Sequence, residues 1–169
     1  IDRMGNIRDT VIFSILKSEW PTVKTALEFK MRKKYWWAMT DAAFEKKFET
    51  GELPPALFTH EAHIRLAWIH IEQYGIEKAI SNIVSQIQSY TLKLGVLEKF
   101  NKTLTVAAVR AVYHFMRKDT SKNFQTFIKN NSRLKNNFKQ IMATHYGFDI
   151  YNSPRARQHY LEPDMLPFD

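Results

Sequence analysis

The chain has 169 residues, a length that allows one or two domains with a buried core. It contains no cysteine, which excludes disulfides, zinc–thiolate sites, iron–sulfur clusters and thiol nucleophiles. The formal net charge is +8, aromatic residues make up 14% of the chain and glycine occurs five times, a composition that favours packed helices over a turn-rich β-fold.

Hydropathy along the chain gives no indication of a membrane segment or a secretion signal. No apolar run approaches the ~20 residues that span a bilayer. The opening residues, IDRMGNIRDT, lack the apolar core of a signal peptide. We therefore expect a cytoplasmic protein without membrane contact, and the absence of cysteine fits a reducing compartment.

The first predicted elements are a β-strand and a helix. Residues 5–16, GNIRDTVIFSIL, have a turn followed by the branched and aromatic residues typical of a strand. Ser18 can then cap a helix that carries Pro21 in its first turn and continues to about Lys34. No second strand is predicted, so the first must pair with a second copy of the chain or another domain, or lie along the helices.

Residues 1–30, which begin IDRMGNIRDTVIFSILKSEWPTVKTAL, resemble the closing strand and trailing helix of a GNAT-type N-acetyltransferase. In that resemblance Arg8, Asp9 and Trp20 match a tail motif without a catalytic role. The family holds acetyl-CoA with a glycine-containing loop that opens a helix, and this chain has no such loop. The resemblance implies an acetyltransferase domain as partner of the lead strand. An acetyl-CoA loop upstream of Ile1 would make the helical part an appendage of that enzyme.

A helix-breaking run predicts the domain boundary. A second helix is expected over residues 36–49, and the sequence GELPP at Gly51–Pro55 ends it. We therefore predict a lead of residues 1–50, which holds the strand and two helices, and a helical domain over residues 56–169.

Helical periodicity continues through this second part. The expected helices span residues 59–74, 76–94, 105–118, 121–130 and 133–145. Gly75 and Gly95 fall where helix C-caps are expected, and the ending LEPDMLPFD should be extended. The predicted fold class is mainly α: a helical-bundle-like domain preceded by a short β-strand and a helix.

Two segments of the helical part resemble an uncharacterised group of bacterial helical proteins. The group has an H-x-x-H-[IL]-R-x-A-W helix and a later K-[FY]-[HN]-x-T-x-T segment, matched here by HEAHIRLAW and KFNKTLT. The resemblance implies a coherent domain over residues 58–169 and names no reaction. Asn101 stands where we expect histidine, which removes one candidate metal ligand.

The candidate site is a cluster of three histidines on one predicted helix. At 3.6 residues per turn, His63 and His70 lie about 20° apart in azimuth and His60 about 60° further round, so all three can face one groove. His60 and His63 are one turn apart and could bind one divalent metal ion with a ligand from another helix. His70 lies roughly 10 Å further along the axis, too far for the same ion.

The helix expected over residues 105–118 could close this groove, because its Arg110 and His114 are four residues apart and can share a face. Our leading hypothesis is a pocket that binds a metal or a small polar ligand through His60, His63, His70, Arg110 and His114. In the structural alternative the histidines bond to carbonyls or pack in the core, and Arg110 lies on a solvated face.

Two other function classes stay open, and the sequence does not decide whether the chain is an enzyme. The lead strand and the aromatic helices could form an interaction module with no catalytic activity. Residues 93–139 hold eleven Lys or Arg against two acids and could attract nucleic acid, although we favour solvated helix faces there. Without a G-x-S-x-G elbow, a P-loop or suitably spaced acids, hydrolase and nucleotide-triphosphatase chemistry are not indicated.

Overall fold

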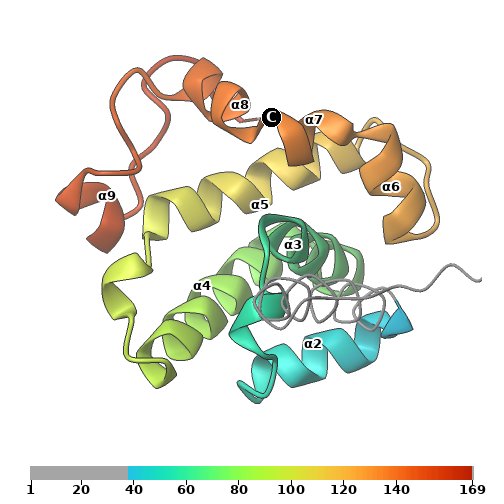
Figure 1. The fold of residues 1–169 in the computed structure, drawn as a ribbon. Coiled ribbons are helices and arrows are strands. Elements are labelled where there is room, and N and C mark those ends of the chain that lie inside the picture. The colour runs from blue at the N-terminus through green and yellow to red at the C-terminus, as the bar shows by residue number, and fades with distance from the viewer. Residues whose placement is uncertain (1–37, 169) are drawn as a thin grey trace, which may run out of the picture. The chain divides into compact units, whose positions relative to one another are not determined.

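The structure, a computed structural model, describes residues 38–168 (Figure 1). The predicted strand, the first helix and the acetyltransferase-like segment lie outside these residues. The chain divides into two compact units, residues 1–38 and residues 39–169. Every regular element between residues 38 and 168 is helical, which confirms the prediction of a mainly α protein for this part.

Helix α2, Asp41–Glu49, belongs to the second unit. Thr40 caps it by accepting a hydrogen bond from Ala43 N, and its buried side chains are two phenylalanines. The GELPP run ends the helix, but Leu53 within that run is 1% exposed and its carbonyl accepts a hydrogen bond from the Tyr90 hydroxyl. The boundary predicted at residues 51–55 therefore lies inside a compact unit, because burial of Leu53 holds the run against the core.

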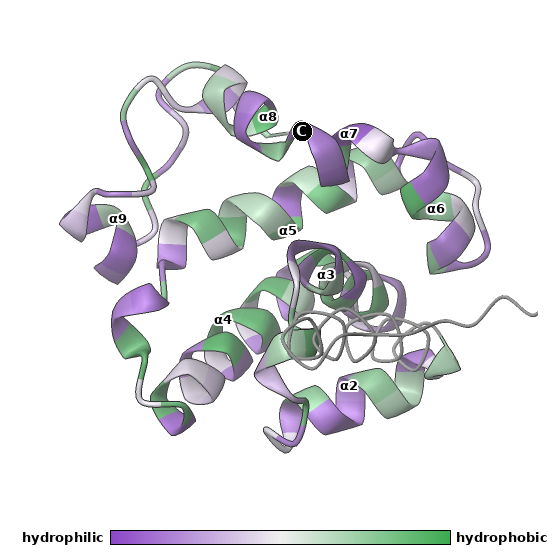
Figure 2. Ribbon diagram, in the orientation of Figure 1, coloured by the Kyte–Doolittle hydropathy of each residue, from purple (hydrophilic) through white to green (hydrophobic). Residues whose placement is uncertain are grey.

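Three longer helices form the centre of this unit: α3, His60–Tyr74; α4, Ile76–Lys93; and α5, Lys102–Met116. Helix α3 lies between α2 and α5 (Figure 1), and nine of its fifteen residues are buried. Apolar residues recur along α3, α4 and α5 (Figure 2), where these helices pack on one another. Gly75, at φ 74°, links α3 directly to α4, a backbone conformation that favours glycine.

The N-terminus of α5 is fixed by Asn101. Its Oδ1 accepts a hydrogen bond from Leu104 N at 2.9 Å, and its Nδ2 donates to the Ile150 carbonyl at 2.7 Å. The helix consequently begins three residues earlier than the sequence predicts. The same side chain also ties α5 to the C-terminal segment, because Asn101 is 7% exposed and uses both ends of its amide.

Short helices surround this centre. They are η1 (Pro55–Leu57), η2 (Leu97–Lys99), α6 (Phe124–Asn130), α7 (Ser132–Asn136), α8 (Phe138–His145) and α9 (Pro154–Gln158). The single helix predicted over residues 133–145 is divided at Asn137, whose φ of −127° and ψ of 26° are not helical. Helix α7 packs against α3, and α9 packs against α5.

Arg65 joins α2 to α3. Its side chain is 1% exposed, and its guanidinium donates to Asp41 Oδ1 at 2.8 Å and to the Met39 carbonyl at 2.6 Å. The guanidinium carbon also lies 5.1 Å from the ring centroid of Phe44. This arginine holds the start of the compact unit against its central helix.

Candidate functional site

A cavity of about 680 Å³ lies among α3, α4, α5 and the α7–α8 segment. Its size is within the usual range of small-molecule sites. The apolar residues that line it are Ile64, Ala67, Ile83, Ile87, Phe100, Leu104, Ala108, Val109, Val112 and Phe138. The polar ones are His60, His63, Lys99, Asn101, Thr105, Lys135, Asn136, Asn137, Lys139, Gln140 and Tyr151.

His63 is held in a defined orientation at the cavity. Its Nδ1 lies 2.7 Å from the Thr59 carbonyl, and its ring stacks on Phe58 with centroids 3.7 Å apart. Burial, opposed by the hydrogen bond to Thr59 and assisted by the neighbouring His60, lowers the pKa of His63 to about 4. The imidazole is therefore neutral at physiological pH, with the proton on Nδ1 and a lone pair on Nε2.

His60 contacts two other helices at the same cavity. Its Nε2 lies 2.8 Å from the Leu134 carbonyl and donates to it, and its ring lies 4.9 Å from that of Phe138. The side chain thus joins the start of α3 to α7 and α8. A metal ion at His60 and His63 would need a further ligand, and residues 38–168 bring together no group of three or more His, Cys, Asp or Glu side chains able to hold one.

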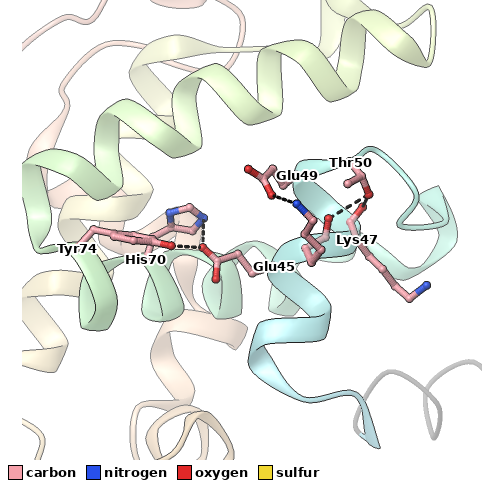
Figure 3. Close-up of polar contacts among 7 residues, drawn as sticks. Glu45, Lys47, Glu49, Thr50, His70 and Tyr74 are labelled. Carbon is pink, nitrogen blue, oxygen red and sulfur yellow. Dashed lines mark hydrogen bonds and ion pairs between the residues drawn. The ribbon is translucent and has the colours of Figure 1, made fainter.

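His70 is not in the cavity. It is fully buried beside α2, where its Nε2 lies 3.6 Å from Glu45 Oε1 (Figure 3). The Tyr74 hydroxyl donates to the same carboxylate at 3.0 Å. Burial lowers the pKa of His70, and Glu45 opposes that shift. This histidine therefore belongs to the α2–α3 contact.

Arg110 and His114 do not line the cavity either. The Arg110 guanidinium lies 6.0 Å from the Tyr160 ring centroid, and His114 Nε2 accepts a hydrogen bond from Lys118 Nζ at 2.9 Å. The direction of the side chains around the axis of α5 explains this. Ala108 and Val112 line the cavity, and Arg110 and His114, each two positions later, point roughly 200° away from them. Of the five predicted site residues, the structure brings His60 and His63 together.

The sequence prediction missed the lysines at the cavity. Lys99 comes from η2, Lys135 from α7 and Lys139 from α8. Lys135 forms an ion pair with Glu61 at 2.8 Å, and Lys139 Nζ lies 5.9 Å from the Tyr151 ring centroid. The sequence feature that could have indicated these three lysines is the basic block of residues 93–139. It contains all three of them, but we interpreted it as a solvated surface.

Comparison of the chain with protein-family models, with curated proteins and with solved structures found no match. Among residues 38–168, no helix combines the length and the apolar character needed to cross a bilayer.

The protonation of His63 provides a test of this geometry. Its imidazole protons should titrate with a midpoint near pH 4 in a nuclear magnetic resonance titration, assigned by loss of the signal in His63→Gln. Because the unfolded side chain titrates near 6.5, the unfolded state takes up the proton first as the pH falls. The stability that depends on a neutral His63 is therefore present in full above pH 6.5, and the free energy of unfolding falls as the pH decreases from 6.5 towards 4. This loss should be smaller in His63→Gln, and a midpoint near 6.5 would contradict the half-buried, stacked position.

Proposed function

We propose that the helical domain binds a small, mainly apolar ligand in the cavity among α3, α4, α5 and α7–α8. The observation that carries the proposal is the apolar wall, to which all three central helices contribute side chains. The wall presents apolar side chains to a space of about 680 Å³ that is partly open to solvent, and apolar surface in contact with water is unfavourable. An apolar ligand would cover that surface and gain roughly 25 cal/mol for each Å² of surface it buries.

The two histidines have separate roles in this proposal. His63 presents a neutral ring to the cavity, and its Nε2 can accept a hydrogen bond from a ligand. His60 keeps α7 and α8 in position through the Leu134 carbonyl. Because residues 38–168 bring no group of three or more His, Cys, Asp or Glu side chains together that could hold a metal ion, we assign these histidines to ligand orientation rather than to a metal centre.

The test is fluorescence titration with phenylnaphthylamine, an uncharged aromatic probe that emits strongly in apolar surroundings. We expect saturable binding to the wild-type chain. Ala108→Phe places a ring inside the cavity from α5 and should weaken binding at least about tenfold, the effect expected when the wall contacts are lost. Far-ultraviolet circular dichroism and urea unfolding confirm that each variant is folded.

A matched control comes from α8. Ala143 is exposed and lies outside the cavity lining, so Ala143→Phe adds the same ring elsewhere and should leave the affinity unchanged. Equal binding by the wild type and Ala108→Phe, or no binding by the wild type, would reject the cavity as the site.

A further inference from the structure

The charges at the cavity have one sign. Three lysines line it, and none of its described lining residues is Asp or Glu. Lys135 is paired with Glu61, whereas Lys99 and Lys139 have no carboxylate partner within residues 38–168. Two ammonium groups therefore remain without a carboxylate counter-charge at the rim of an apolar space; both lysines are exposed, so each would attract an anion with the modest, salt-sensitive strength of a surface ion pair.

The walls behind these lysines are apolar and deeply buried. Ile64, Ile83 and Ile87 are at most 9% exposed, and Val109 and Val112 are each 1% exposed. A small hydrophilic anion would lose its hydration against these side chains without compensation. An uncharged hydrocarbon would fill the space but leave the lysines without a partner.

His63 adds no positive charge to this arrangement. Its ring is neutral because burial lowers its pKa to about 4, and its Nδ1 proton is held by the Thr59 carbonyl. The positive potential at the cavity thus comes from Lys99 and Lys139, which belong to two different segments, η2 and α8. A ligand must satisfy an apolar interior and a cationic rim together.

We infer that the ligand of this cavity is an amphiphilic monoanion, with a hydrocarbon or aromatic body among α3, α4 and α5 and an acidic head at Lys99 and Lys139. This inference rests on the proposed function and specifies the ligand class of the same site. Long-chain carboxylates and aromatic carboxylates or sulfonates share this chemistry. The ion pair of Lys135 with Glu61 leaves that lysine to hold α7 to α3.

The test compares two probes with the same aromatic body. Anilinonaphthalene sulfonate carries one negative charge, and phenylnaphthylamine carries none. We expect the anion to bind the wild type about tenfold more tightly than the neutral probe, the size that two partly exposed ion pairs provide. In the double variant Lys99→Gln, Lys139→Gln this preference should disappear while the neutral probe binds as before, and rising salt should weaken only the anion.

The control double variant is Lys122→Gln, Lys129→Gln, which removes two exposed lysines of the same basic block outside the cavity. It should retain the preference for the anion. If the neutral probe binds and the anion binds no more tightly, the ligand class is wrong and the cavity function stands. If the control loses the preference as fully as the cavity variant, the inference fails as well, whereas failure of both probes to bind rejects the proposed function itself.

A second pair of probes distinguishes the body of the ligand. Dodecanoate and benzoate each carry one carboxylate and are tested as competitors of the bound sulfonate probe. Displacement by dodecanoate at lower concentration supports a chain-like ligand, and displacement by benzoate alone supports a compact aromatic one. Both outcomes retain the amphiphilic anion, and displacement by neither would overturn it.

Discussion

Replacing Arg65 with alanine should lower the free energy of unfolding by about 3 kcal/mol, at the lower end of the cost of breaking a buried ion pair. The lower end applies because Asp41 is 36% exposed at its side chain and can be rehydrated, whereas the Met39 carbonyl loses its donor. The variant also loses the packing of the guanidinium on Phe44. Urea unfolding followed by far-ultraviolet circular dichroism measures the change.

Arg155→Ala is the matched control, because Arg155 is exposed on α9. Its effect should stay within about 0.5 kcal/mol. Arg65→Lys keeps the positive charge but loses the planar guanidinium with its several donors, so we expect a loss of stability between those of Arg65→Ala and Arg155→Ala. Hydrogen exchange should accelerate most in α2, since Arg65 anchors that helix. Equal stability of Arg65→Ala and Arg155→Ala would show that the buried contacts contribute no net stability.

Replacing Phe48 with alanine should cost about 3–5 kcal/mol, the usual range for truncating a buried phenylalanine. The ring is 1% exposed and lies 4.5 Å from that of Phe58 and 5.0 Å from that of Tyr90. Phe58 in turn stacks on His63. Loss of Phe48 should therefore loosen Phe58, admit water to His63 and move the pKa of His63 up towards 6.5.

Unfolding in urea and the His63 titration are measured on the same variant. Leu92→Ala serves as control, because Leu92 is 63% exposed and its truncation should leave both quantities nearly unchanged. Phe48→Leu should give a smaller loss of stability than alanine. If Phe48→Ala is destabilised but His63 still titrates near pH 4, Phe48 contributes to the core but does not influence His63 through Phe58.

The helices that the sequence located well have strong local signals at their ends. Residues 59–74 and 76–94 were predicted, and α3 and α4 occupy His60–Tyr74 and Ile76–Lys93. Thr59 caps α3, and Gly75 separates the two helices. The division between α7 and α8 at Asn137 was missed because apolar spacing continues across it, and only the backbone of that residue departs from a helix.

The candidate site was predicted in part, and the reason lies in the surroundings of α3. Helical azimuth places His63 and His70 on one side, but they are separated by almost two turns and meet different neighbours. His63 reaches the cavity, and His70 reaches Glu45 of α2. Because α3 is buried on more than one face, residues at similar angles around its axis can contact different helices. The helical angle alone therefore does not predict which histidines lie near α5.

The α7–α8 wall of the cavity is joined to α3 by the hydrogen bond from His60 to the Leu134 carbonyl and by the ion pair of Lys135 with Glu61. Lys135 is 43% exposed at its side chain, so water competes for that pair. Rising salt should weaken this ion pair more than the hydrogen bond of His60, so the α7–α8 wall should exchange its amide protons faster at high ionic strength while α3, α4 and α5 change little.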